Sequence, residues 1–400
     1  MINTAAGLLV PFHRASIGED EVLAVSEVLR SGWLTMGART EEFERQFAKY
    51  VGAQHAVALS SCTAALHLAL EAIGIGPGDE VLLPTTTFTA TAASVIYLGG
   101  RPALVDIDPS TMNLDPEDAT RRVTRRTSAI LPVHMAGQPC DLAAIHTLAA
   151  EHGLRVIEDA AHALPASYRG QFVGAVSEFT AFSFYATKTL TTGEGGMVTT
   201  SNAAAAERMR MMRLHGIARD AWKRYSAQGS WRYEVMEAGY KYNFTDLQAA
   251  IGLVQLKKCN AMQEARQRVA QQYFAGLEQI EEFELPVIWS DRKSSWHLFL
   301  LRLHLEKLEI GRDEFIEELK QRGIGSSVHF IPLHLHPFYQ REFGYRPGDF
   351  PKAEAEYRRC ISLPIFPTMQ AEEIEQVILA LTDIVQRRAK RYRTRRHASR

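Results

Sequence analysis

The sequence is poor in cysteine and has no long apolar run, and each shortage excludes a class of protein. Only four of its 400 residues are cysteine, and they lie far apart with no CxxC pair: Cys62, Cys140, Cys259 and Cys360. This spacing gives neither a disulfide framework nor a zinc or thiol-redox motif. No run reaches the roughly 18 apolar residues of a membrane-spanning helix. The N-terminus lacks the basic and apolar regions of a secretory signal, and we therefore expect a cytoplasmic protein.

Net charge is almost absent as well, but the charge is unevenly placed. The formal net charge is −1, from 45 basic and 46 acidic residues. Eight of the basic residues and none of the acidic ones lie within residues 387–400, so residues 1–386 have a net charge of −9. An acidic body offers no broad footprint for nucleic acid, and we expect no nucleic-acid partner. Residues 387–400 are predicted to form a basic, disordered tail.

Several motifs of well-known chemistries are missing. The sequence contains no GxxxxGK[ST] phosphate loop, no GxGxxG that opens a helix after a strand, and no HExxH. Ser60 and Ser61 do not stand in a GxSxG elbow. These absences disfavour P-loop, dinucleotide-binding, zinc-protease and α/β-hydrolase functions, and no metal site is predicted.

From residue 54 onward, short apolar runs alternate with longer segments in which apolar residues recur at helical spacing. Strands are predicted over residues 55–59, 80–83, 102–105, 129–133, 155–158 and 180–185, with helices over 63–73, 89–98, 115–124 and 141–152 between them. This alternation predicts an α/β protein with a doubly wound, mainly parallel sheet and helices on both faces. Ligands of such sheets bind beyond the carboxyl ends of the strands.

The two ends of the chain do not share the strand–helix alternation of this middle part. Residues 13–50 are predicted to be helical around a break at 31–33, and a long helix is predicted from Thr245 to about Leu277. A strand-and-helix module of different composition follows from Trp296. We therefore divide the chain into a large domain, 1–256, with an N-terminal helical segment, and a smaller C-terminal α+β domain, 257–386. The polar and aromatic segment 216–239 is predicted to be an irregular excursion that could pack on a partner.

One lysine, Lys188, follows the strand predicted over 180–185 and lies in a loop of small and hydroxyl residues. An ammonium group held among apolar and hydroxyl groups loses hydration, so its pKa falls and the neutral amine can attack a carbonyl. Pyridoxal phosphate enzymes use such an amine to hold the cofactor as a Schiff base. The alternative is a solvated lysine beside a glycine-rich turn, which is the commoner case for a lysine taken at random.

An acid for the pyridine nitrogen is available at the end of another predicted strand. Asp159 follows the buried run 155–157, where its carboxylate could keep the nitrogen protonated. Glu158 should point to the opposite side of the strand. The alternative for Asp159 is a helix N-cap. His162, three residues further on, could contact the cofactor or a substrate.

The sequence also contains candidate groups for binding the cofactor phosphate and for stacking on its pyridine ring. Residues 60–66 join a strand to a helix, where exposed N–H groups and the Thr63 hydroxyl could bind phosphate. Ser183 lies five residues before the lysine and could reach the same phosphate. Phe88 follows a further strand end and could stack on the pyridine ring, with ordinary core packing as the alternative. Each signal is weak alone, but together they fit pyridoxal phosphate better than other cofactors.

With these residues the chain resembles the DegT/DnrJ/EryC1/StrS family of sugar-nucleotide aminotransferases over about residues 10–385. The resemblance rests on motifs in order: SGWLT at 31–35, SCTAAL at 61–66, GDEV at 78–81, VIEDAAH at 156–162, FSF at 182–184 with TK at 187–188, GEGG at 193–196 and GYKYN at 239–243. Within the family the chain looks most like the branch acting on UDP-4-keto sugars, notably the enzyme that makes UDP-4-amino-4-deoxy-L-arabinose for lipid A. Residues 160–163, 239–243 and 296–299 carry that closer likeness.

The resemblance implies the fold type I of pyridoxal phosphate-dependent transferases, as in aspartate aminotransferase, and a homodimer with shared active sites. It implies Lys188 as the catalytic Schiff-base lysine, Asp159 on the pyridine nitrogen, and further cofactor contacts from His162, Phe88, Cys62, Thr63 and Ser183. Asn243, with Lys241 nearby, would reach the phosphate from the partner subunit. His329 would lie near the substrate, with a packed strand histidine as the alternative.

Some positions depart from the pattern of the resembling enzymes. Cys62 stands where Gly or Ala is usual, Phe88 stands where the arabinose enzymes carry Trp, and Tyr185 stands where they carry His. Residues 332–337 look more like general sugar aminotransferases. These departures bear on the identity of the sugar, and Tyr185 is a candidate substrate contact. A dehydratase branch of the family replaces the Schiff-base lysine with His, and Lys188 argues against that branch.

The resemblance implies an aminotransferase that moves an amino group from L-glutamate, leaving 2-oxoglutarate, to the keto carbon of a nucleotide-linked keto sugar. We expect a UDP-linked sugar aminated at C4 by a ping-pong mechanism, in cell-surface polysaccharide, lipid A or secondary-metabolite sugar biosynthesis. The alternatives are a pyridoxal phosphate-dependent sugar dehydratase and a non-catalytic cofactor-binding regulatory protein that uses the basic tail.

Overall fold

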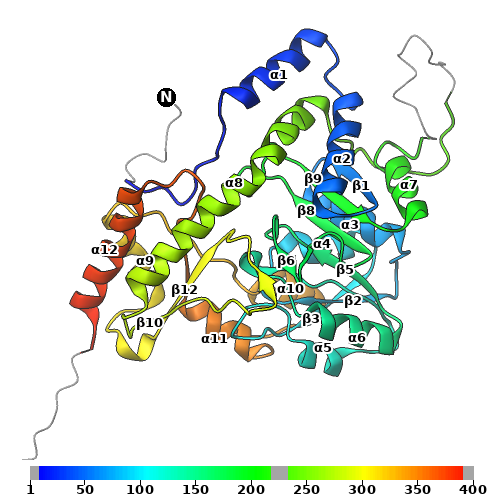
Figure 1. Ribbon diagram of the computed structural model, residues 1–400. Coiled ribbons are helices and arrows are strands. Elements are labelled where there is room, and N and C mark those ends of the chain that lie inside the picture. The colour runs from blue at the N-terminus through cyan, green and yellow to red at the C-terminus, as the bar shows by residue number, and fades with distance from the viewer. Residues whose placement is uncertain (1–8, 218–232, 391–400) are drawn as a thin grey trace, which may run out of the picture.

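The computed structural model describes residues 9–217 and 233–390 (Figure 1). Its main feature is a seven-stranded sheet in the order β1-β9-β8-β5-β4-β2-β3. Neighbouring strands from β8 to β3 run parallel, whereas β9 (Gly196–Thr200) runs antiparallel to both β1 (His55–Leu59) and β8 (Phe179–Ser183). The predicted α/β fold with a mainly parallel sheet is confirmed.

The remaining strands of this sheet alternate with helices along the chain. The strands are β2 (Glu80–Pro84), β3 (Arg101–Val105), β4 (Thr127–Ile130) and β5 (Arg155–Asp159). The helices are α3 (Cys62–Ala72), α4 (Thr89–Tyr97), α5 (Pro116–Arg122), α6 (Leu142–His152) and α7 (Ala203–Met212). Most of these boundaries lie within two residues of the predicted ones.

Helices cover both faces of the sheet, and the side chains of β2 show how. Val81 and Leu83 belong to an apolar cluster with residues of α3, α4 and α7, whereas Leu82 belongs to another cluster with residues of α5 and α6. Successive side chains of a strand point to opposite faces, so the two clusters lie on opposite sides of the sheet. All five residues of β2 are buried, as expected of a strand covered on both faces.

Helices α1, α2 and α8 lie outside this alternation. The predicted helical segment 13–50 forms α1 (Glu19–Ser31) and α2 (Ala38–Val51), and Gly32 ends α1 in a left-handed conformation with φ 73°. The long helix α8 (Asp246–Leu277) starts with a capping box between Thr245 and Gln248. Figure 1 shows α8, in light green, running from α1 and α2 to α9 and α12.

A second core forms around the far half of α8. It contains a sheet of β10 (Phe283–Glu284), β12 (Phe299–Leu303) and β13 (Cys360–Leu363), and helices α9 (Arg312–Gln321) and α12 (Ala371–Arg388). Helices α10 (Pro337–Phe343) and α11 (Pro351–Arg359) instead pack on the apolar cluster of α3 and α4. Tyr273 and Leu277 of α8 pack in its main apolar cluster, whereas Leu253 and Leu256 pack in a cluster with α2. The predicted division after residue 256 falls inside this continuous helix, and it stays a prediction.

Short elements complete the described fold. A small sheet joins β11 (Arg292–Lys293), β6 (Ser167–Tyr168) and β7 (Gln171–Phe172). Single 3₁₀ turns are η1 (Met135–Gly137), η3 (Leu305–Lys307) and η4 (Leu333–Leu335). Among the described helices, none has the length and apolar character needed to cross a bilayer.

Two predictions concern segments that are only partly described. The disordered tail predicted from residue 387 is wrong for its first four residues, because α12 continues to Arg388, which forms an ion pair with Glu318. Lys390 donates a hydrogen bond to the carbonyl of Glu306. Residues 391–400 lie outside the described residues, and so does most of the excursion predicted over 216–239, residues 218–232.

Candidate active site

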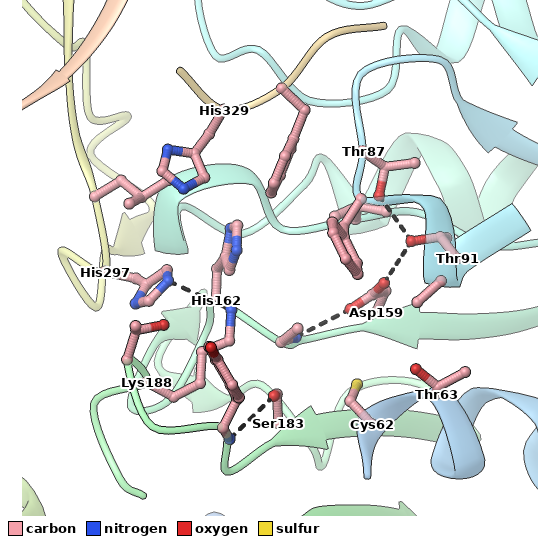
Figure 2. A pocket seen from close by; sticks show the side chains of 18 of the residues that line it. Cys62, Thr63, Thr87, Thr91, Asp159, His162, Ser183, Lys188, His297 and His329 are labelled. Atoms are coloured by element: carbon pink, nitrogen blue, oxygen red, sulfur yellow. Dashed lines mark hydrogen bonds between the residues drawn. The ribbon is translucent and has the colours of Figure 1, made fainter. Parts of the chain in front are cut away.

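A cavity of about 320 Å³ lies where three strands of the large sheet end. Its wall includes Thr87, three residues beyond β2, Asp159 at the end of β5, and Ser183 at the end of β8. The carboxyl ends of parallel strands are where ligands of such sheets bind. The structure brings nine of the eleven predicted site residues to this wall: Cys62, Thr63, Phe88, Asp159, His162, Ser183, Tyr185, Lys188 and His329. All of these except Phe88 and Tyr185 are labelled in Figure 2.

Lys188 lies in the loop after β8, with its backbone N–H bonded to the carbonyl of Tyr185 at 2.9 Å. Burial lowers the pKa of its amine to about 8; the Asp159 carboxylate opposes this shift and the Arg266 cation adds to it. Its Nζ lies 3.5 Å from Nε2 of His297. A lysine with this pKa is partly neutral near pH 8, which is the form that acts as a nucleophile or a base.

Asp159 and Glu158 point to opposite sides of β5, as predicted. Oδ2 of Asp159 accepts a hydrogen bond of 2.8 Å from Thr91 Oγ1, and Oδ1 accepts one of 3.1 Å from the N–H of Ala161. Burial raises the pKa of Asp159, against the effect of these donors. Glu158 instead meets Nε2 of His134 at 2.6 Å, with both side chains fully buried. No helix begins at Asp159, so the N-cap alternative is wrong.

The N-terminus of α3 forms one wall of the cavity. Ser61 is its N-cap and accepts a hydrogen bond from the N–H of Ala64, and Cys62 and Thr63 form the first turn. Backbone N–H groups of a first helical turn have no partner within the helix and can bind an anion. Burial raises the pKa of the Cys62 thiol well above its usual value, so the thiol stays neutral beside such an anion.

Gly196, the first residue of β9, allows the sheet to approach this helix end. A Cβ at Gly196 would collide with the carbonyl of Ser61 and would lie 2.6 Å from the amide nitrogen of Cys62. Any side chain at this position would push the helix N-terminus away from β9. The absence of a side chain at Gly196 is therefore part of the geometry of the anion-binding wall.

Histidines from four separate segments line the cavity: His13, His162, His297 and His329. Burial lowers the pKa of His13 and of His329 to about 4, and it lowers the pKa of His162 and of His297 well below the usual value. All four are therefore neutral near pH 7. Neutral imidazoles can each donate one hydrogen bond and accept another, which suits hydroxyl and carbonyl groups.

Two of these histidines escaped the sequence analysis. His13 belongs to the N-terminal segment and contacts the carbonyl of Ala186, 173 positions away, at 3.1 Å. His297 belongs to the WHLF motif at 296–299, which was quoted for the resemblance but was given no role. His329, which was predicted, contacts Oγ of Ser362 at 2.8 Å and stacks on Phe12 with ring centroids 5.6 Å apart.

Phe88 and Tyr185 present aromatic rings at the opening of the cavity. Phe88 is 60% exposed and its ring centroid lies 6.0 Å from that of Phe330. Core packing, the alternative for Phe88, is therefore wrong in this chain taken alone. Tyr185 is 46% exposed.

Lys241 and Asn243 do not reach this cavity. Nζ of Lys241 donates a hydrogen bond of 2.5 Å to Oδ1 of Asn243, and Asn243 pairs with Leu59 at the end of β1. Their predicted role toward the phosphate of a partner subunit stays a prediction.

These groups fit pyridoxal phosphate. An amine with a lowered pKa, a buried carboxylate on another strand and a helix N-terminus share one cavity. Nδ1 of His162 and Nδ1 of His297 are buried and have no hydrogen-bond partner within the described residues. Across these same residues, no group of three His, Cys, Asp or Glu side chains is arranged to hold a metal ion.

Comparison with known proteins agrees with this assignment. A sequence profile of the DegT/DnrJ/EryC1/StrS aminotransferase family matches residues 15–382. The chain is 48% identical over 377 residues to the spore coat polysaccharide biosynthesis protein SpsC of Bacillus subtilis, covering 94% of this chain and 97% of SpsC. It is 50% identical over 376 residues to an uncharacterized protein of Methanocaldococcus jannaschii, covering 94% of this chain and 97% of that protein.

Solved structures extend the comparison to the cofactor. Spr1654 of Streptococcus pneumoniae, assigned as a sugar aminotransferase, is 32% identical and covers 94% of this chain and 99% of its own. The TM-score is 0.89 for its pyridoxamine phosphate form and 0.88 for its pyridoxal phosphate form. With the family match and the fit of the cavity, these forms identify pyridoxal phosphate as the cofactor of the site.

Proposed function

We propose, from the premise that this chain belongs to the DegT/DnrJ/EryC1/StrS aminotransferase family, that it moves an amino group from L-glutamate to C4 of a UDP-linked keto sugar. The observation that carries the proposal is the partly buried amine of Lys188, which shares one cavity with Asp159 and with the N-terminus of α3. Only a lysine can serve as both cofactor anchor and base here, which favours transamination over the dehydratase alternative.

The residues of the cavity divide the work of the reaction. Pyridoxal phosphate, when bound, supplies an electron sink for the carbon that loses a proton. The carboxylate of Asp159 would keep a proton on the pyridine nitrogen, and the first turn of α3 would hold the phosphate, with the Thr63 and Ser183 hydroxyls beside it. Nζ of Lys188 would take the proton from the amino donor and return it, because its lowered pKa leaves a neutral amine available.

A sugar as amino acceptor is supported by the neutral wall of the cavity. His13, His162 and His329 carry no charge near pH 7, so they can bond to hydroxyl groups without demanding an acidic ligand. Tyr185 and Phe88 lie at the opening, where a sugar would enter. The name of SpsC, a spore coat polysaccharide biosynthesis protein, supports a place in cell-surface polysaccharide synthesis.

The decisive experiment follows both halves of the reaction in the purified holoprotein. L-Glutamate alone should release 2-oxoglutarate and change the visible spectrum of the cofactor. A panel of UDP-, dTDP- and GDP-linked keto sugars should then restore the spectrum, with UDP-4-keto sugars the most effective. Lys188→Ala should abolish turnover and also the borohydride fixation of the cofactor to the chain. Turnover by this variant, or a preference for dTDP or GDP sugars, would contradict the proposal.

We also propose a homodimer in which Lys241 and Asn243 complete the site of the partner subunit. Both lie outside the cavity of their own chain, although the sequence motif at 239–243 matches the family pattern. Mixing Lys188→Ala chains with Asn243→Ala chains tests this arrangement. Each variant alone should be weak, and mixed dimers should recover activity because one of their two sites has neither change. Mixtures no more active than the average of the two variants would contradict a shared site.

A further inference from the structure

His297 lies just before β12 and reaches Lys188 from 109 positions away. Nε2 of His297 and Nζ of Lys188 are 3.5 Å apart, and Figure 2 shows this contact as a dashed line between the two side chains. Among the residues that the structure describes, this is the only hydrogen-bonding contact of the Lys188 side chain. His297 is thus placed to act on the amine rather than on the cofactor ring.

The backbone around His297 is fixed from two sides. Nη1 of Arg266, in α8, donates to the carbonyls of Trp296 at 3.3 Å and of His297 at 3.4 Å. The N–H of Leu298 donates to the carbonyl of Ala136 at 3.2 Å. Trp296 has φ 51°, a left-handed conformation that is unfavourable for a bulky residue. Such a conformation persists only where the surroundings impose it, so the backbone that carries His297 has a defined position.

The ring of His297 is enclosed by protein. It is buried, and the ring of His162 lies against it with centroids 4.4 Å apart. Its Nδ1 has no hydrogen-bond partner among the residues the structure describes. Burial disfavours a charge on this imidazole, and the cations of Lys188 and Arg266 add to that effect. The ring is therefore neutral, and its Nε2 faces Nζ of Lys188.

We propose that His297 is a positioning residue whose Nε2 accepts a hydrogen bond from Nζ of Lys188 whenever that amine is not bonded to the cofactor. The proposal rests on the role given to Lys188 under the proposed function. A free lysine side chain can adopt many rotamers, so an unpaired amine would spend much of its time away from the reacting carbon. One fixed acceptor keeps the amine inside the cavity during each half of the reaction.

The chemistry of imidazole suits this task better than that of a carboxylate. A carboxylate at the same place would form an ion pair with the ammonium group and raise its pKa. A neutral imidazole orients the amine but stabilises its charge much less. Because the imidazole resists protonation here, it cannot keep the proton that Lys188 must return. His297 would thus aim the amine and leave its basicity available.

The test measures Lys188 in the protein without cofactor, where the amine is free. The rate of acetylation of Lys188, read by mass spectrometry across pH, gives the pKa of this one amine. His297→Phe keeps a ring of similar size and removes the acceptor, so the ammonium form loses a hydrogen bond. We expect the pKa of Lys188 to fall by about one unit or more. His297→Asn retains a polar acceptor and should show a smaller fall.

His13→Phe is the matched control, because His13 lines the same cavity but contacts the carbonyl of Ala186. It should leave the pKa of Lys188 near the wild-type value. An unchanged pKa in His297→Phe, or an equal fall in the control, would overturn the proposal. If the phenylalanine variant does not fold, His297→Leu is titrated in its place. The titration uses no sugar, so a wrong sugar assignment in the proposed function would leave its result intact.

Discussion

Oγ1 of Thr91, in α4, donates a hydrogen bond of 2.8 Å to Oδ2 of Asp159, at the end of β5. Thr87 Oγ1 lies 2.7 Å from Thr91 Oγ1, so two buried hydroxyls stand in line behind the carboxylate. Burial raises the pKa of Asp159, and the hydrogen bond from Thr91 opposes that rise. Thr91 therefore helps to keep an ionised carboxylate in a site with little water.

Thr91→Val tests this relationship. Valine matches the shape of threonine but donates no hydrogen bond, so the pKa of Asp159 should rise further and its hold on a protonated pyridine nitrogen should weaken. Since a hydrogen bond to a charged group contributes about 1.5–3 kcal/mol, we expect kcat to fall by about 10- to 100-fold. Thr91→Ser keeps the hydroxyl and should stay within a few-fold of wild type. Equal kinetics for the valine and serine variants would contradict a role for the hydroxyl.

The positions of the predicted site residues explain why the sequence could reveal them. Asp159, Ser183 and Lys188 each stand at or just beyond the end of a strand, and the carboxyl ends of parallel strands share one edge. The local sequence pattern, which locates the strand ends, was therefore enough to predict that these three residues lie together. Thr63 could be found in the same way, because the strand-to-helix turn before it has a recognisable composition.

The residues that were missed depend on packing between distant segments. His13 enters the site from the N-terminal segment. Arg266, in the middle of α8, lies outside the cavity lining and acts through its bonds to the carbonyls of Trp296 and His297, and the local pattern there indicates only one face of a helix. Thr91 lies within a helix, and the sequence around it contains no motif that would indicate its contact with Asp159. The division after residue 256 was placed by composition, which cannot show that one helix continues through two apolar cores.

Gly196→Ala should weaken cofactor binding without blocking folding of the sheet. The added methyl group would collide with the carbonyl of Ser61 and push the N-terminus of α3 away from β9. The N–H groups that would hold the phosphate would then move out of position. We expect at least a tenfold higher dissociation constant for pyridoxal phosphate, measured by equilibrium dialysis. Gly76→Ala is the matched control, because a Cβ at Gly76 has no atom within 4 Å. Similar dissociation constants for the two variants would contradict this account.

Arg266→Met should lower stability and also change Lys188. The Arg266 side chain is 1% exposed, and no described carboxylate forms an ion pair with it. Its Nη1 donates to the carbonyls of Ile365, Trp296 and His297, so methionine would leave these acceptors without their donor. Relief of a buried charge offsets part of this cost. We expect a net loss of about 2 kcal/mol in the free energy of unfolding.

Two measurements separate the effects of Arg266→Met. Thermal unfolding should show a midpoint several degrees below that of wild type, whereas Arg268→Met, at an exposed position of the same helix, should not. Because the Arg266 cation lowers the pKa of Lys188, that pKa should rise in Arg266→Met. A variant with wild-type stability would show that the three carbonyl contacts contribute little.

The lowered pKa of Lys188 predicts how the cofactor-free protein responds to pH. Only the neutral amine attacks the aldehyde of pyridoxal phosphate, and burial lowers the pKa of this amine to about 8. Below pH 8 the rate constant for covalent incorporation should therefore fall about tenfold per pH unit, and above pH 8 it should level off. Stopped-flow absorbance between pH 6 and 10 would show this break. An exposed lysine with the usual pKa of about 10.4 would instead give a rate that still rises at pH 10.

His13 and His329, with pKa values of about 4, should add no further break near pH 6.5 to the pH dependence of this rate. A break near 6.5 that disappears in His329→Gln would mean that the cavity is wetter than its packing indicates, and that a histidine rather than Lys188 controls the reaction.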